Sequence, residues 1–134
     1  ALVLLAVAGN VATTINLPSL SSSMIGVWYE FAHTVLNTSA YTIKRGNEGT
    51  DVFIGGLFGA SDQASNGGAY ANGRFKAPGG SDDTITIDDG GTQSDAALGT
   101  NFKVIAVSAT QWYVEGQFLT DTEANTLANI FSNT

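Results

Sequence analysis

The segment from Asn101 to Leu119 consists of two alternating arms joined by the short polar loop Ser108 to Thr110. Apolar side chains occupy every second position of each arm: Phe102, Val104 and Ala106 in the first, and Trp112, Val114 and Phe118 in the second. Successive side chains of a strand point to opposite faces, so each arm offers one face to a core. The segment therefore predicts a β-hairpin, and it contains no catalytic group.

Composition favours the same kind of structure along the rest of the chain. Only 13% of the 134 residues are charged, against about 25% in typical domains, and 16 are glycine. Long helices usually carry Glu, Lys and Arg on their exposed face, whereas turn-rich β structure does not need them. A chain of this length is expected to form a single β-rich domain, residues 1–134.

Several other segments have the form of short strands. The longest, Ile25 to Val35, places Tyr29, Phe31 and His33 on one face and Trp28 and Glu30 on the other. Further segments of this kind are Val11–Leu17, Tyr41–Lys44, Asp51–Phe58, Ala69–Lys76 and Asp83–Asp88. Gly55-Gly56 within one of them indicates a bulge or a close approach of another backbone. About eight short strands separated by turns predict an all-β sandwich or barrel.

The first residues, 1–8, form the continuous apolar run ALVLLAVA. The run is far shorter than the roughly 20 residues that span a bilayer, so we expect no membrane partner. A strand buried on both faces reads as such a run, and so does an apolar arm that docks on a partner. We expect one of these two rather than the remnant of a targeting segment.

The last segment, residues 120–134, changes its period. Thr120 to Glu123 fits a capping box at a helix start, and Ala124, Leu127, Ala128 and Phe131 follow helical spacing. The pattern predicts a C-terminal tail with one short helix. A helix this short is not stable alone, so it is expected to dock on the β core or on another subunit.

Charge and cysteine content exclude several classes of function. The net charge is −7, and the five basic residues form no cluster that would neutralise phosphates, so nucleic acid is rejected as a partner. The chain has no cysteine, which rules out disulfides and zinc sites built from thiolates.

The sequence offers no convincing catalytic set. His33 is the only histidine, so any Ser-His-Asp triad must use it. Its strand register places it beside Phe31, which favours a core or rim histidine. A glycosidase needs two facing carboxylates, and the four glutamates are isolated in the sequence. We therefore expect no enzyme, and we expect no cofactor and no metal.

Five aspartates flank one predicted strand and the loop that follows it: Asp82, Asp83, Asp88, Asp89 and Asp95. Calcium takes several oxygen ligands from close positions, but the EF-hand pattern is absent. Aspartates at strand ends also bond to nearby backbone amides in turns. Turn chemistry is the preferred interpretation, and a calcium site remains the second.

Trp28 lies on a mixed face with Glu30. Tryptophan there suits a subunit interface, an intrachain core or a ligand platform. The residues proposed to contact a partner are the apolar side chains of the two ends together with this tryptophan: Leu2, Leu4, Leu5, Trp28, Leu127, Ile130 and Phe131.

In their order, seven blocks of the chain resemble the small capsid decoration (cement) proteins of tailed bacteriophages, notably marine and cyanobacterial phages. Their order and approximate spacing cover residues 11–119, which is most of the chain, and the blocks are Thr13–Pro18, Gly26–Phe31, Thr38–Lys44, Asp51–Leu57, Asp83–Asp88, Gly99–Thr100 and Trp112–Gly116. The chain departs from the family pattern in its helical period from Glu123 to Phe131 and in a longer insert from Ser61 to Lys76.

The resemblance implies a β-tulip-like fold and a non-catalytic protein of the virion, on the outer surface of the capsid. Its implied partners are the phage major capsid protein and further copies of itself, as a homotrimer at local three-fold positions. The family has no catalytic motif to carry across. An alternative from another class is a carbohydrate-binding β-sandwich, free or as a tail-fibre or receptor-binding component.

Overall fold

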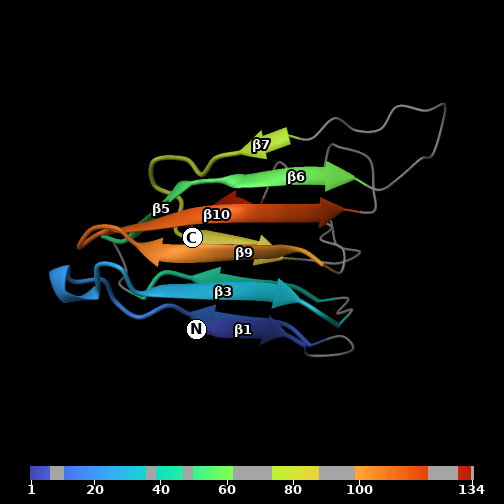
Figure 1. Ribbon diagram of the computed structural model, residues 1–134, viewed down its shortest axis with the longest axis horizontal. Helices are drawn as coiled ribbons and strands as arrows, with labels where there is room; N and C mark the ends of the chain where they lie inside the picture. The colour runs from blue at the N-terminus through green and yellow to red at the C-terminus, as the bar shows by residue number, and fades with distance from the viewer. Residues whose placement is uncertain are drawn as a thin grey trace.

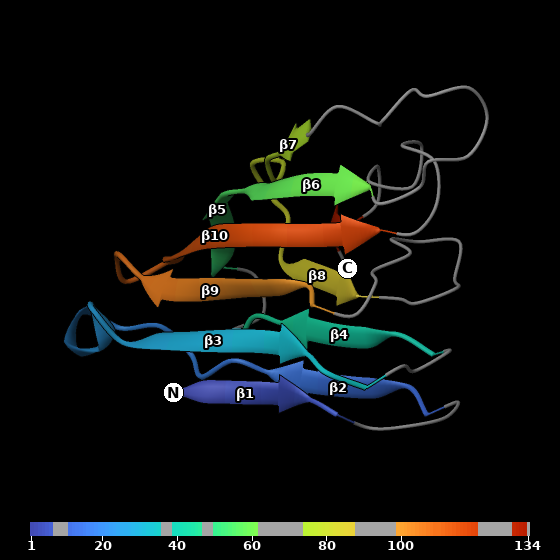
Figure 2. The ribbon, with the colours of Figure 1, turned by 45° about the vertical axis from the view of Figure 1, so that its right-hand side comes forward.

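The computed structural model describes residues 1–6, 11–35, 39–46, 50–61, 74–87, 99–120 and 130–133. In these ranges eleven strands, rather than about eight, form two sheets. Figures 1 and 2 show the two sheets as layers that face each other. The arrangement is sandwich-like, as predicted, and the one helical element among these residues is a short 3₁₀ turn at Ser22–Met24.

The larger sheet has seven strands. Its order is β1 (Leu2–Leu5), β3 (Trp28–His33), β9 (Asn101–Ala106), β10 (Gln111–Thr120), β6 (Leu57–Ser61) and β7 (Arg74–Lys76), and β5 (Val52–Gly55) also pairs with β10. The smaller sheet has the order β11 (Phe131–Ser132), β8 (Thr84–Ile87), β4 (Tyr41–Lys44) and β2 (Thr13–Asn16).

The chain passes repeatedly from one sheet to the other. β1 lies in the larger sheet, β2 in the smaller, β3 in the larger and β4 in the smaller. Because each return keeps its direction, β1 pairs with β3 in parallel and β2 pairs with β4 in parallel. Both sheets are therefore mixed, and neither is formed by one continuous stretch of sequence.

The predicted hairpin is confirmed. β9 and β10 pair antiparallel with Val104 opposite Val114. The predicted inner faces are buried, because all six apolar side chains of the alternation lie in the core: Phe102, Val104, Ala106, Trp112, Val114 and Phe118. Local alternation was sufficient to assign the faces of both arms.

The Gly55-Gly56 pair marks a close approach of two backbones. β5 and β6 follow β10 in one register, since Val52 lies opposite Gln111 and Phe58 opposite Gln117. The strand is thus interrupted without an inserted residue. Gly55 has φ +86°, and a Cβ there would meet the carbonyl oxygen of Val114, so a larger residue does not fit.

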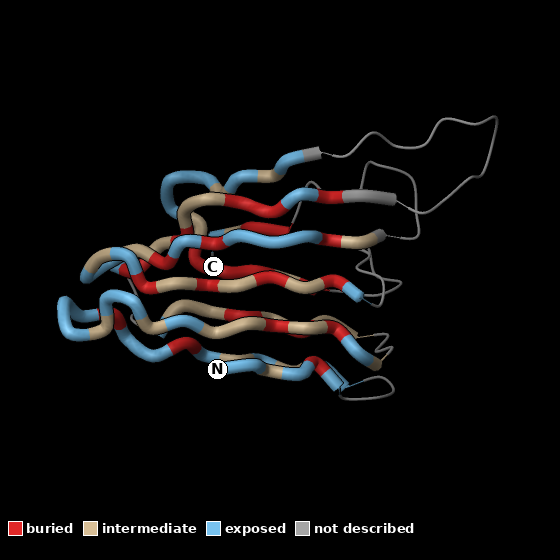
Figure 3. The backbone as a smooth tube through the Cα atoms, in the orientation of Figure 1, coloured by how far each residue is buried: buried red, intermediate tan, exposed pale blue. Residues whose placement is uncertain are grey.

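The core lies between the sheets and is rich in aromatic rings. Phe31 and Phe102 stack with centroids 5.2 Å apart, and Tyr29 contacts Trp112 at 6.0 Å. His33 is buried against the Tyr41 ring at 5.7 Å, which agrees with a core histidine. Figure 3 shows buried segments in red alternating with exposed ones along the strands.

Both ends differ from expectation. β1 is an edge strand whose outward Leu2 and Leu4 are 60% and 57% exposed, so a strand buried on both faces is wrong. At the other end, Phe131 belongs to β11 and pairs with Ile85 instead of closing a helix. The rest of the expected helix, at residues 121–129, lies outside the described residues.

Candidate interaction surface

The outer face of the larger sheet, the side turned away from the smaller sheet, carries several large apolar side chains. One row crosses three strands, because Trp28 and Tyr113 both lie opposite Ile105. Trp28 is 42% exposed, and Tyr113 is also exposed. Since their sequence neighbours point into the core, the strand pleat holds this row outside.

A second apolar group lies at the far side of the same face. Phe58 on β6 lies opposite Phe75 on β7, and the two side chains are 52% and 66% exposed. The Phe75 ring covers the backbone of Gly56. At the other side of the sheet, Leu2 and Leu4 extend the apolar surface onto β1.

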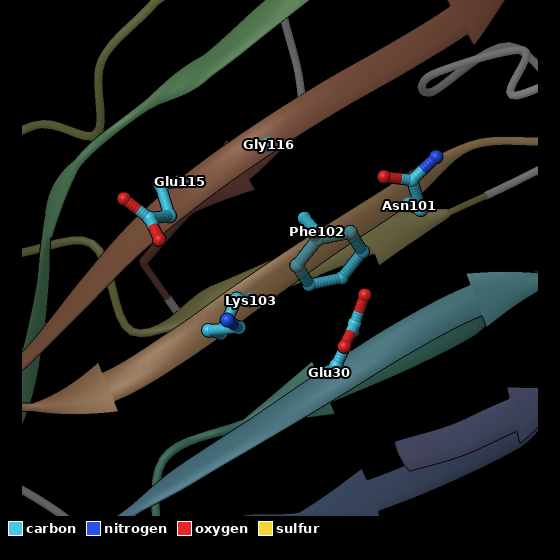
Figure 4. Close-up of a pocket in the computed structure, with 6 residues that line it drawn as sticks. All are labelled: Glu30, Asn101, Phe102, Lys103, Glu115 and Gly116. Carbon is cyan, nitrogen blue, oxygen red and sulfur yellow. The ribbon is translucent and has the colours of Figure 1, made fainter. Parts of the chain in front are cut away.

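A charged row divides these apolar groups. Glu30 on β3 and Glu115 on β10 both lie opposite Lys103 on β9, and Figure 4 shows the three side chains on neighbouring strands. They line an open depression of about 310 Å³ together with Asn101, Phe102 and Gly116.

Lys103 contacts an aromatic ring. Its Nζ lies 4.9 Å from the centroid of the Trp28 ring, a distance typical of a cation–π contact. The one salt bridge found among the described residues lies elsewhere, between Arg45 and Asp83. The Lys103 ammonium therefore packs against the Trp28 ring on the outer face of the larger sheet.

The outer face of the smaller sheet has a different character. Its register aligns Thr14, Thr42 and Thr86 in one row, with Asn16 and Lys44 in the next. These side chains are small or polar, and they suit contact with water. The sandwich therefore has one outer face with large apolar side chains on both sides of a charged row, and one outer face with small or polar side chains.

The structure divides the predicted contact residues into two groups. Leu2, Leu4 and Trp28 lie together on the outer face of the larger sheet. Leu5, Ile130 and Phe131 are buried in the core of the chain, so in this conformation they offer little surface to a partner. Leu127 lies outside the described residues.

The sequence prediction missed Phe58, Phe75 and Tyr113 as members of this surface. Tyr113 carried a usable signal, because it alternates with Trp112 and Val114 in the predicted hairpin. Phe58 likewise alternates with Leu57, which is buried. Phe75 gave no local signal, since its place depends on the pairing of β7 with β6.

The described aspartates act as structural groups. Asp83 binds Arg45 and accepts a hydrogen bond from Thr84 Oγ1 at 2.7 Å. Asp82 accepts one from the Gly79 amide at 2.7 Å, which is ordinary turn chemistry. Asp88, Asp89 and Asp95 lie outside the described residues, and within those residues no group of three or more acidic or histidine side chains is placed to hold a metal ion.

Among the described residues, no helix has the length and apolar character needed to cross a bilayer. No protein-family model matches the chain, and neither the curated proteins nor the solved structures include a match.

Proposed function

We propose that this protein is a non-catalytic structural protein of a phage virion, which decorates the outer surface of the capsid and stabilises the shell. The observation that carries the proposal is the apolar outer face of the larger sheet, where Trp28, Phe58, Phe75 and Tyr113 are exposed. Large exposed apolar patches mark sites of interaction with other macromolecules.

The contrast between the two outer faces supports an oriented attachment. The face of the larger sheet would meet the shell, and the face with Thr14, Thr42 and Thr86 would remain in water. Burial of apolar surface contributes roughly 25 cal/mol per Å² before the costs of association are subtracted. The resemblance to phage decoration proteins names the major capsid protein as the partner.

The proposal is tested by mixing the purified protein with expanded phage heads that lack decoration. Binding is measured by cosedimentation, and shell stability by the temperature at which the heads release DNA. The double variant Phe58→Ser, Phe75→Ser is expected to weaken binding. The matched control, Thr14→Ser with Thr42→Ser on the opposite face, should bind as the parent does. Absence of binding by the parent protein, with no gain in heat resistance, contradicts the proposal.

A carbohydrate-binding module is the second candidate, and one observation favours it. The Trp28 ring lies beside Glu30, Lys103 and the open depression that Glu30, Lys103 and Glu115 help to line, so an aromatic surface stands next to groups that bond hydroxyls. A glycan array separates the candidates. Saturable sugar binding that Trp28→Ala abolishes, without binding to heads, would favour this module.

A further inference from the structure

The first strand ends the larger sheet with a free edge. Glu30 and Thr34 donate their amides to the carbonyls of Ala1 and Leu5, so the odd-numbered residues of β1 face β3. The amides and carbonyls of Leu2 and Leu4 therefore point away from the sheet. Within the described residues, no strand pairs with β1 on that side.

The other edge strands carry features that discourage pairing. β5 pairs with β10 on one side, and on its other side the Phe53 amide already donates to the Asp82 carbonyl. β7 contains Arg74 and Lys76 in three residues, β11 has two residues, and β2 presents Thr14 and Asn16 before Pro18. Charges, extreme shortness and nearby proline are the usual protections of a sheet edge. Leu2–Leu5 has no charge, no proline and no glycine. β1 is thus the least protected edge.

We propose that β1 pairs antiparallel with β1 of a second copy of this chain, around a two-fold axis at Val3. In this register Leu2 lies opposite Leu4 of the second copy, and Leu4 lies opposite Leu2 of the second copy. Both are residues whose amides and carbonyls face outward, so the two strands exchange four backbone hydrogen bonds. The pairing is self-complementary, as a two-fold interface requires.

The side chains also suit this occupant. The outward Leu2 and Leu4 of both copies would form one apolar cluster that continues the outer faces of the two larger sheets. β2 lies behind β1 at the same side of the sandwich (Figure 2). Pairing of the two larger sheets through β1 would therefore also bring the smaller sheets of the two copies toward each other. A charge-free edge is what two chains of net charge −7 need in order to meet, and added salt should strengthen their association.

This inference does not rest on the proposed function, and it is tested in solution without heads. The full chain is measured by analytical ultracentrifugation over a range of concentrations. The expected result is an equilibrium between one copy of 13.8 kDa and two. A monomer at every concentration, or the trimer that the resemblance implies, overturns the proposal.

Cysteine variants test the register, because the natural chain has no cysteine. Val3 would face its own counterpart across a non-hydrogen-bonded pair, where the Cα atoms lie about 4.5 Å apart and a disulfide is feasible. Val3→Cys should therefore form a disulfide dimer on mild oxidation. The control Leu4→Cys faces Leu2 of the second copy and should crosslink much more slowly. Equal or reversed crosslinking contradicts the register.

A second variant tests the backbone pairing without changing the side chain of Val3, in case Val3→Cys disturbs packing. Leu4→Pro removes an amide that faces the free edge and leaves the bonds to β3 intact. It should weaken self-association by about tenfold or more, since each copy loses one donor. Thermal unfolding measured by circular dichroism should stay near that of the parent. Unchanged association of this variant argues against edge pairing.

Discussion

Arg45 and Asp83 form a salt bridge at the end of the smaller sheet, with Arg45 Nη2 2.8 Å from Asp83 Oδ2. Arg45 Nη1 also donates to the backbone carbonyl of Asp51 at 3.0 Å. The Asp51 carboxylate in turn accepts the amide of Leu20 at 3.0 Å. Three segments that are distant in sequence are thereby joined beside the core.

Removal of the arginine should be costly. Arg45→Met removes the guanidinium that pairs with the buried Asp83 carboxylate, and loss of one partner of a buried pair typically costs about 3 kcal/mol or more. We expect a fall of that size in the free energy of unfolding, measured by urea titration. Lys44→Met on the outer face is the control and should change it by no more than about 0.5 kcal/mol. Equal effects would contradict the structural role of the pair.

Alanine substitutions at three glycines compare the destabilisation caused by steric contact with the destabilisation caused by backbone strain. Gly116 has φ +143°, and a Cβ there would lie 2.5 Å from the Asn101 carbonyl oxygen. Gly26 has φ +92°, but a Cβ there would have no atom within 4 Å. Gly116→Ala should therefore cost more than about 2 kcal/mol of stability, and Gly26→Ala about 1 kcal/mol. Gly80→Ala has neither problem and serves as the control. The order of the three denaturation midpoints checks this, and a Gly116 variant as stable as the control contradicts it.

Trp112 is buried, and no described atom accepts a hydrogen bond from its Nε1. Trp112→Phe removes that donor, so the relief of an unpaired polar group offsets part of the lost packing. We expect a change within about 1.5 kcal/mol. Trp112→Ala should cost about 3 to 5 kcal/mol, because it leaves a cavity. Similar losses in the two variants would show that the indole nitrogen is satisfied in solution.

Trp28 provides a direct probe of the outer face. The chain has two tryptophans, so the Trp112→Phe variant emits from Trp28 alone. Because Trp28 is exposed, acrylamide should quench its fluorescence strongly in the free protein. Binding to phage heads should protect it. Quenching that stays unchanged in the bound protein would mean that Trp28 lies away from the contact.

Local periodicity predicted the faces of the longest strands. The alternation around Trp112 and Phe31 gave the buried sides of β10 and β3 correctly. A period of two is a local property that each strand carries alone. The same reasoning placed Trp28 on the face opposite Phe31 but left a subunit interface, an intrachain core and a ligand platform open, and the structure puts it on the outer face.

Pairing between distant segments was beyond local reasoning. Hydrophobicity alone does not tell an edge strand from a central one, so the exposure of Leu2 and Leu4 did not follow from their sequence. The opposition of Phe58 and Phe75 depends on β7 joining β6. The spacing of Phe131 from the preceding apolar residues happened to match a helical period. Its pairing with Ile85 places it in a strand instead.

The alternation of the chain between the two sheets has a kinetic consequence. Among the described strands, β1 pairs with β3 and β2 pairs with β4, so the first strands of both sheets depend on segments that come later in the chain. Folds dominated by such distant pairings close large loops before contacts stabilise them, and they fold in roughly milliseconds to seconds. Folding and unfolding of the described sandwich should therefore be slow and cooperative, with both layers gained or lost together.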